Sequence, residues 1–261
     1  MSVYCNGQRA TADELAAALV NHGHFTSLQV RGGAVQGLDL HLRRLRQGTE
    51  ALFGSALEGS QVQAWIAAAL QAEGVADASV RVTVFSRAFD FRQPLQAVPV
   101  DVLVAVGAPV NLPATPRRVR AVEYQREMPQ LKHVGTFGLF QQRRLALLAG
   151  FDDALFVDGQ GRVSEGTTWN VAFACGDAVV WPQAEALRGT QERLLQAGWG
   201  GVPTLAVVRR QDLAGFDAAI ACNASGVWPL AAIDGVPFAG SGALCRKAVE
   251  VLVATRWQPL D

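Results

Sequence analysis

The chain has 261 residues with 23 basic and 23 acidic side chains, so its formal net charge at pH 7 is zero. A balanced charge gives no general attraction to nucleic acid or to an anionic membrane. No apolar run approaches the roughly 20 residues that span a bilayer, and residues 1–10 lack the pattern of a signal peptide. Because half of the residues are apolar, we expect a cytoplasmic globular protein with no nucleic-acid or membrane partner.

The cysteine pattern gives no sign of a metal site. Cys5, Cys175, Cys222 and Cys245 lie far apart in the sequence, and no Cys-x-x-Cys or Cys/His pair has zinc-ligand spacing. We therefore expect no bound metal. Reduced thiols are the simplest interpretation, although the sequence leaves a disulfide open.

The first part of the chain predicts a mixture of strands and helices. A hairpin is indicated by two strand-like runs around Gly32-Gly33. Strands are predicted at 25–31, 34–40, 79–86 and 98–106. Helical periodicity is found at 40–53 and 61–73.

A cluster of three prolines, Pro109, Pro113 and Pro116, then interrupts the pattern. Proline lacks a backbone donor and fixes φ, so this stretch favours neither helix nor central strand. We predict a small N-terminal α/β domain at 1–110, a proline-rich linker at 111–117 and a larger C-terminal domain at 118–261. In the larger domain, strands are predicted at 118–124, 154–157, 168–174, 178–181, 203–209 and 218–222, and helices at 135–150 and 189–197.

Lys132 is the most informative single residue. It lies just before the predicted 135–150 helix, and the second half of the chain has one other lysine, Lys247. The positive end of a helix dipole disfavours a charged lysine, which favours the neutral amine that attacks carbonyl groups. The competing interpretation is a solvated surface lysine.

Two further charged residues are candidates for a site. Glu165 follows a turn and opens an apolar strand, where a carboxylate needs a partner; the alternative is an exposed glutamate bonded to Arg162. Arg44 lies on a predicted helix, and its guanidinium could bind an oxyanion such as phosphate. The alternative there is a solvated basic face shared with Arg43 and Arg46.

Small residues at two turns could bind an anion. Gly189-Thr190 opens a helix whose backbone N–H groups could face a phosphate, although Gly and Thr are also common helix caps. Asn223-Ala224 follows a strand and could form a second anion-binding turn. His24 could reach a substrate or be structural. The fingerprints of dinucleotide-binding, P-loop and Gly-x-Ser-x-Gly enzymes are missing from the sequence.

Taken in order, these segments resemble the class IV aminotransferase family, the fold-type IV pyridoxal-phosphate enzymes. The ordered series, with the interval between Lys132 and Glu165, carries the resemblance and spans about residues 4–235. The matching segments are Gly23-His24-Phe25-Thr26-Ser27, His41-Leu42-Arg43-Arg44-Leu45, Leu131-Lys132-His133, residues 150–158, residues 161–170, Leu187-Arg188-Gly189-Thr190, Cys222-Asn223-Ala224 and Pro229-Leu230.

The resemblance implies a two-domain α+β fold like that of D-amino acid aminotransferase, with pyridoxal 5′-phosphate between the domains, and a homodimer. It implies that Lys132 is the Schiff-base lysine and moves the proton between Cα and C4′. Glu165 is implied to face the pyridine nitrogen and keep it protonated. The phosphate is implied to bind Arg44 and backbone amides near Gly189, Thr190, Asn223 and Ala224.

The sequence departs from the family pattern in three places. Branched-chain aminotransferases have a tyrosine five residues after the lysine, whereas this chain has Phe137. The helix-opening motif, usually Gly-Ile-Thr-Arg, is Gly189-Thr190-Gln191-Glu192, so the hydroxyl is displaced by one position. Asn223 stands where transaminases often have threonine, and Cys222-Asn223-Ala224, Lys132-His133 and Phe25-Thr26 resemble aminodeoxychorismate lyase.

We therefore predict a transaminase acting between an amino acid or related amine and a keto acid, with a lyase that releases pyruvate as the alternative. A non-catalytic relative that keeps the fold, and a nucleotide-binding α/β domain, are less favoured by the residues. Candidate substrate contacts are His24, Arg87 and Trp169, with Arg126 as a further arginine near Lys132.

Overall fold

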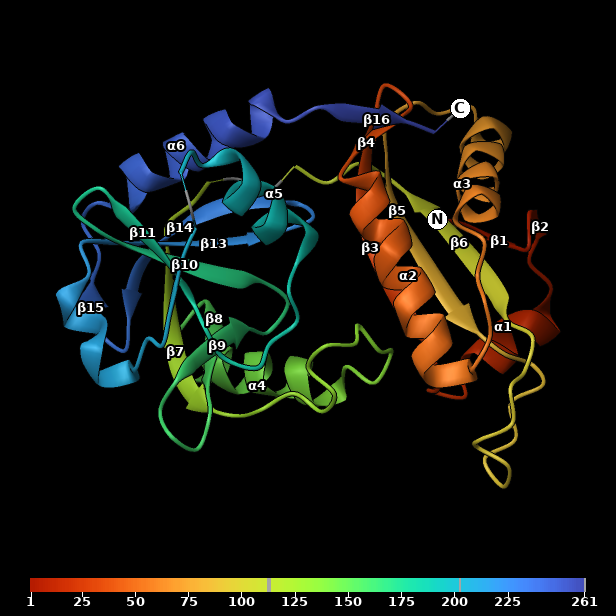
Figure 1. The fold of residues 1–261 in the computed structure, drawn as a ribbon, viewed down its shortest axis with the longest axis horizontal. Coiled ribbons are helices and arrows are strands. Elements are labelled where there is room, and N and C mark those ends of the chain that lie inside the picture. The colour runs from red at the N-terminus through yellow and green to blue at the C-terminus, as the bar shows by residue number, and fades with distance from the viewer. Residues whose placement is uncertain (112–113, 202, 261) are drawn as a thin grey trace. The chain divides into compact units, whose positions relative to one another are not determined.

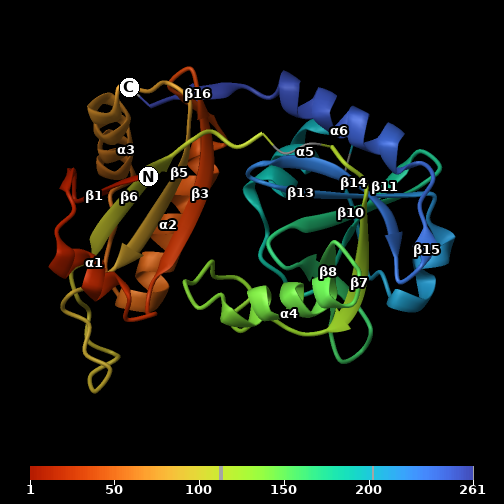
Figure 2. The same ribbon diagram turned by 180° about the vertical axis from the view of Figure 1, so that it is seen from behind.

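A computed structural model describes residues 1–111, 114–201 and 203–260. The chain forms two compact units (Figures 1 and 2). Unit 1 contains Met1–Val110, Leu131–Gly135 and Arg256–Asp261, and unit 2 contains Asn111–Gln130 and Thr136–Thr255. Two short segments that we expected in the C-terminal domain, one of them around Lys132, thus belong to unit 1.

Unit 1 is built on a sheet to which seven of the described strands contribute, in the order β16-β4-β3-β5-β6-β1-β2. Its centre, β3-β5-β6, is antiparallel, with Phe25 opposite Thr83 and Thr83 opposite Leu103. The strands are β1 (Ser2–Cys5), β2 (Gln8–Arg9), β3 (His24–Arg31), β4 (Ala34–Gln36), β5 (Ala78–Phe85), β6 (Asp101–Gly107) and β16 (Trp257–Pro259).

Helices cover this sheet because alternate strand residues are apolar on the face that they contact. Helices α2 (Leu38–Phe53) and α3 (Gly59–Glu73) pack on the face that carries Leu28, Val80 and Val104. On the opposite face, α1 (Ala12–Ala18) covers a smaller cluster of Cys5, Phe85 and Leu103. A capping box between Thr11 and Glu14 fixes the start of α1.

Unit 2 is built on a mixed sheet in which, among the described residues, the strand order is β12-β11-β10-β13-β14-β7-β8-β9, with β15 paired to β14. The pairs β7-β8, β7-β14 and β11-β12 are parallel, and the others are antiparallel. The strands are β7 (Arg117–Glu123), β8 (Asp153–Val157), β9 (Val163–Gly166), β10 (Asn170–Cys175), β11 (Ala178–Pro182), β12 (Thr204–Ala206), β13 (Ala218–Asn223), β14 (Gly226–Ile233) and β15 (Val236–Pro237).

The sheet of unit 2 curls, so that strands from both of its ends share one core. Val163 of β9, Phe173 of β10 and Leu155 of β8 are fully buried in this core with Trp228. Helices α5 (Thr190–Gly198) and α6 (Ser241–Ala254) cover β10, β11 and β13, and α4 (Phe137–Leu148) covers β8. A short 3-10 helix lies at Arg210–Gly215.

Most predicted elements of the chain are present, but several boundaries were wrong. The strand predicted at 98–106 begins at Asp101, after Pro99, and the strand predicted at 203–209 ends at Ala206. The strand predicted at 34–40 ends at Gln36, because Gly37 adopts φ +66° and α2 begins at Leu38. The helix predicted at 135–150 begins at Phe137, after Thr136 at its N-cap position. Residues 112–113 of the predicted linker lie outside the described residues.

No helix in the described ranges is both long and apolar enough to cross a membrane. All four cysteines are free, and Cys5, Cys222 and Cys245 are buried. No three His, Cys, Asp or Glu side chains of the described residues form a group that could hold a metal ion.

Candidate functional site

The predicted site residues fall into two groups, one in each unit. Unit 1 contains Lys132, Arg44, His24 and Arg87, and unit 2 contains Glu165, Trp169, Gly189, Thr190, Asn223 and Ala224. The first group contains three cationic side chains, and in the second group Glu165 and Asn223 form hydrogen bonds with main-chain groups.

Main-chain hydrogen bonds to unit 1 fix the position of Lys132. The amide of Phe25 donates to the Lys132 carbonyl at 2.9 Å, and the amide of Val134 donates to the Gly23 carbonyl at 2.9 Å. His24 and His133 form the antiparallel bridge between these segments. Lys132 therefore lies beside the start of β3, five residues before the first residue of α4. The dipole argument assumed a helix that starts at residue 135, and with the first helical residue at Phe137 it stays a prediction.

Arg44 lies on α2 and faces β3. Its Nη1 donates to Thr26 Oγ1 at 3.5 Å, and the same hydroxyl is 2.6 Å from Nδ1 of His41. Burial, Arg44 and Lys132, in that order, lower the pKa of His41 to about 3. His41 is therefore neutral at physiological pH and bonds Thr26 without adding a third positive charge. Sequence reasoning gave His41 and Thr26 no role, although both lie in the quoted motifs.

The Phe25 ring contacts two cations. Nζ of Lys132 is 4.9 Å from the ring centroid, and Cζ of Arg81 is 3.6 Å from it. Stacking on an aromatic face favours a cation that has lost part of its hydration. Lys132 and Arg81 thus share the Phe25 ring, whereas Arg44 bonds Thr26, whose side chain points to the opposite face of β3.

The other two predicted residues of unit 1 are engaged elsewhere. His24 is 1% exposed, its Nε2 is 3.0 Å from Thr49 Oγ1, and burial lowers its pKa to about 4. Arg87 donates from Nε and Nη2 to both carboxylate oxygens of Asp101, at 3.0 and 2.9 Å. These contacts indicate that both side chains stabilise unit 1. Their roles in substrate binding stay predictions.

Glu165 is the buried carboxylate of unit 2. It lies inside β9 rather than at the entrance of a strand, and it is 5% exposed. Its Oε1 accepts a hydrogen bond of 3.2 Å from the amide of Leu187. Nε of Arg162 instead bonds Oδ2 of Asp158 at 2.6 Å. The alternative prediction, an exposed Glu165 bonded to Arg162, is therefore wrong. The nearby positive charge is Arg126, which is also buried and whose pKa is lowered chiefly by that burial.

The start of α5 holds a buried hydroxyl group that lacks a partner. Thr190 is 3% exposed, and within the described residues its Oγ1 has no hydrogen-bond partner. The amide of Gly189 donates to Oε2 of Glu192 at 3.1 Å, so in this structure Glu192 uses that N–H group. Burial raises the pKa of Glu192, and Arg188 bonds its Oε1 at 3.0 Å. An unsatisfied hydroxyl at a helix N-terminus fits a phosphate oxygen.

The turn between β13 and β14 lies beside the start of β10, where Cys222 pairs with Asn170. Oδ1 of Asn223 accepts from the Ser225 amide at 2.9 Å, which shapes the turn that carries Ala224. Nδ2 of Asn223 donates to the Thr168 carbonyl at 3.3 Å. The turn is therefore tied to residues 166–169, where Trp169 is 2% exposed and packs on Trp228.

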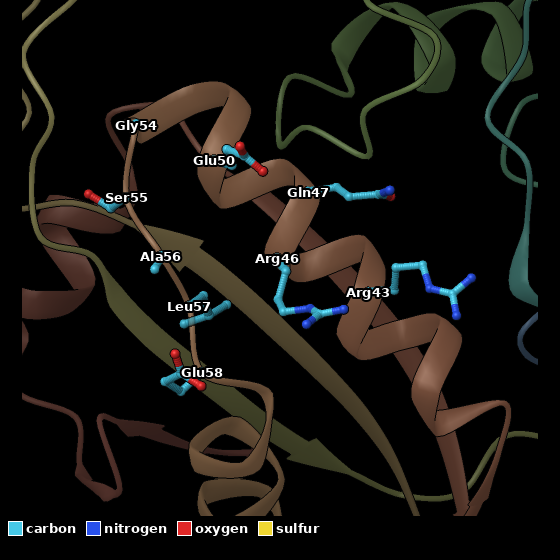
Figure 3. A pocket seen from close by; sticks show the side chains of 9 residues that line it. All are labelled: Arg43, Arg46, Gln47, Glu50, Gly54, Ser55, Ala56, Leu57 and Glu58. Atoms are coloured by element: carbon cyan, nitrogen blue, oxygen red, sulfur yellow. The ribbon is translucent and has the colours of Figure 1, made fainter.

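A separate hollow of about 620 Å³ lies beside the outer face of α2 (Figure 3). Arg43 and Arg46 line it together with Glu50, Glu58 and the loop at 54–58. No residue of the predicted site is among its described lining residues. Arg43, although adjacent to Arg44, belongs to this exposed face of the helix.

Sequence comparison identifies one family. The family described as amino-transferase class IV matches residues 23–233, which include every residue of the predicted site. A search of curated proteins gave no match.

Solved structures of similar fold cover the whole chain. The T.th. branched-chain amino acid aminotransferase with pyridoxamine 5′-phosphate has a TM-score of 0.85 at 19% identity, covering 100% of this chain and 98% of that chain. The branched-chain aminotransferase of Thermoproteus uzoniensis with norvaline has a TM-score of 0.84 at 19% identity, covering 100% and 99%. A Legionella pneumophila protein that carries the name putative 4-amino-4-deoxychorismate lyase has a TM-score of 0.77 at 17% identity, and the match covers 90% of this chain and 91% of that chain. These likenesses confirm the predicted α+β fold class.

Proposed function

The chain belongs to the amino-transferase class IV family, and on that premise we propose that it is a pyridoxal-phosphate-dependent transaminase. Its substrates would be an amino acid or related amine and a keto acid. The observation that carries this proposal concerns the lysines. The chain has two, Lys132 and Lys247. Lys132 alone lies within the matched segment, where its Nζ lies over the Phe25 ring and its charge, like that of Arg44, lowers the pKa of His41.

Each unit offers residues that suit the proposed cofactor. Arg44 and the hydroxyl of Thr190 would bind its phosphate, together with the Asn223-Ala224 turn and the backbone near Gly189. Glu165 would face the pyridine nitrogen, since it is a buried carboxylate held by a main-chain amide. Pyridoxal phosphate, when bound, supplies an aldehyde that bonds an amine and a ring that withdraws electrons from Cα.

The chain's own residues would then do the proton chemistry. Lys132 would attach the cofactor and, once displaced by the amino donor, take the proton from Cα and return it at C4′. Glu165 would hold the proton at the ring nitrogen, because an anion there favours the protonated form. The buried surroundings of Glu165 make this electrostatic effect larger than it would be in water.

The attachment test uses the small number of lysines. We expect borohydride reduction of the protein with bound pyridoxal phosphate, followed by digestion and mass spectrometry, to find the pyridoxyl group on Lys132. Lys247 is the internal control, since it lies on the exposed side of α6 with its Nζ 5.2 Å from the Trp199 ring. Label on Lys247 alone, or on neither lysine, would contradict the proposal.

The lyase alternative keeps the same site residues. It is supported by the residues that resemble aminodeoxychorismate lyase, whereas Phe137, which has no hydroxyl group, counts only against the branched-chain subtype. A transaminase given amino donor alone should convert its cofactor to the pyridoxamine form and stop. A lyase given its substrate should release pyruvate over many turnovers with an unchanged cofactor spectrum, and that result would replace our first proposal.

We also propose that the enzyme is a cytoplasmic homodimer. The homodimer is supported by the family resemblance and by apolar side chains on α4 that solvent would otherwise contact, since Phe137, Leu148 and Phe140 are 82%, 69% and 52% exposed. Light scattering of the purified protein should give twice the mass of one chain, and a monomer at micromolar concentration would contradict this assignment.

A further inference from the structure

Asn170 is a buried polar residue to which neither the family resemblance nor the mechanism above gives a role. It is the first residue of β10 and is 5% exposed. Its Nδ2 donates to the Leu187 carbonyl at 2.7 Å. A buried amide of this kind stabilises the segment it bonds, because the alternative is an unsatisfied polar group.

The segment that Asn170 holds leads directly to the phosphate-binding residues. Leu187 is bonded at both ends of its main chain: its carbonyl accepts from Asn170, and its amide donates to Glu165 Oε1 at 3.2 Å. Two residues later Gly189 is the N-cap of α5, and Thr190, with its unpartnered hydroxyl, is the first residue of the helix. Leu187 therefore connects the carboxylate of Glu165 to the start of α5.

The side chain of Asn170 also packs tightly against the main chain of Gly189. A Cβ added to Gly189 would lie 2.2 Å from Oδ1 of Asn170, far closer than real contacts allow. The Asn170 amide thus contacts the 187–189 segment at two points. The absence of a side chain at Gly189 is what permits this approach.

The backbone of Asn170 fixes the second phosphate-binding segment. In the ladder between β10 and β13, Asn170 lies opposite Cys222, the residue before Asn223. Asn223 in turn donates to the Thr168 carbonyl, two residues before Asn170. Asn170 therefore links two segments. Its side chain holds the start of α5, and its strand, β10, holds the Asn223-Ala224 turn.

We propose that Asn170 is a positioning residue for the cofactor phosphate, which sets the spacing between Thr190 and the Asn223-Ala224 turn. This inference rests on the proposed function. It assigns Asn170 no contact with the cofactor. Its prediction is that losing the Asn170 side chain weakens binding of the phosphate more than binding of the pyridoxal ring.

The test compares two ligands in one variant. For Asn170→Ala, we expect the dissociation constant of pyridoxal phosphate to rise about tenfold, while that of pyridoxal, which lacks the phosphate, changes less than about threefold. Both constants are measured by the protein fluorescence change on titration of the apoprotein. If Asn170→Ala does not fold, Asn170→Ser replaces it, because a serine hydroxyl is too short to reach the Leu187 carbonyl.

Ser241→Ala is the matched control. Ser241 is 3% exposed, and its Oγ accepts from the Ala219 amide of β13 at 2.9 Å, at the end of the strand away from Cys222. We expect Ser241→Ala to lower the midpoint of thermal unfolding without changing the ratio of the dissociation constants of pyridoxal phosphate and pyridoxal. An unchanged ratio in the Asn170 variant, or an equal change in the control, would overturn the inference. A wild-type protein that binds neither ligand would instead overturn the proposed function.

Discussion

The two groups of predicted site residues are held in different ways. In unit 1, Lys132 and Arg81 lie against the Phe25 ring, and Arg44 reaches Thr26 over 3.5 Å. In unit 2, the amide of Leu187 bonds Glu165, and Asn223 is tied to Ser225 and Thr168.

This difference indicates a division of labour. Cations on apolar surface keep a strong field toward an incoming anion, because they are only partly hydrated. Groups bonded to main chain have fixed directions, which suits the recognition of a rigid ring and a tetrahedral phosphate. We therefore expect substitutions in unit 1 to act through charge and the amine, and substitutions in unit 2 to act through geometry.

The largest effect should come from removing the amine of unit 1. We expect Lys132→Ala to lower kcat by at least about 1,000-fold, because it loses both the covalent attachment and the acid–base group. The visible absorption of the lysine-bound cofactor should also disappear. Lys247→Ala is the control and should stay within about twofold of the wild type, since Lys247 lies on an exposed helix face. Equal losses of kcat in the two variants would contradict a catalytic role for the Lys132 amine.

The next effect concerns the carboxylate of unit 2. We expect Glu165→Gln to lower kcat roughly 100-fold while pyridoxal phosphate still binds, because a neutral amide cannot stabilise the proton on the ring nitrogen. The Leu187 amide can still donate to the glutamine oxygen, so the geometry is kept and charge alone is tested. Steady-state kinetics at saturating substrate measure the change. Unchanged kcat would show that Glu165 does not act on the ring.

The sequence predicted the family better than the surroundings of the candidate site residues. Lys132, Arg44 and Glu165 stood out because their motifs occur in family order, and the family is confirmed. The surroundings of Lys132 depend on hydrogen bonds to Phe25 and Gly23, more than a hundred residues earlier in the chain. Pairing over such a separation leaves no local periodicity to detect, so the sequence did not predict that Lys132 lies beside β3.

Burial was equally difficult to predict for polar residues. Asn170 and Glu192 lie within or beside the quoted motifs, yet nothing in their spacing shows that both are nearly inaccessible to solvent. Asn170 bonds the Leu187 carbonyl, and Glu192 accepts from the Gly189 amide as well as from Arg188; the two backbone partners carry no sequence signal. Elements with clear periodicity, such as α2 and β5, were predicted within two residues because their apolar stripes are local.

A third prediction separates two adjacent arginines of unit 1. We expect Arg44→Ala to weaken binding of pyridoxal phosphate about 10- to 100-fold, the range for losing a charge-assisted hydrogen bond. Arg43→Ala removes the same charge from the exposed face of α2, beside the hollow in Figure 3, and should change the affinity by less than about twofold. Equilibrium dialysis at two salt concentrations measures both. Equal weakening in the two variants would mean that general charge, rather than the position of Arg44, attracts the phosphate.

The smallest effect at neutral pH concerns the buried histidines of unit 1. Burial lowers the pKa of His24 to about 4 and that of His41 to about 3, from the usual value of 6.5.

Because the unfolded chain binds these protons first, the stabilisation is complete above about pH 6.5 and is lost as the pH falls toward 4. Each histidine adds at most about 1.4 kcal/mol per pH unit to the slope of the unfolding free energy in that window. We expect His24→Asn to have a shallower slope than the wild type, whatever its stability at neutral pH, in urea unfolding monitored by circular dichroism. Identical slopes would show that the folded and unfolded proteins bind the His24 proton over the same pH range, so that burial does not lower its pKa.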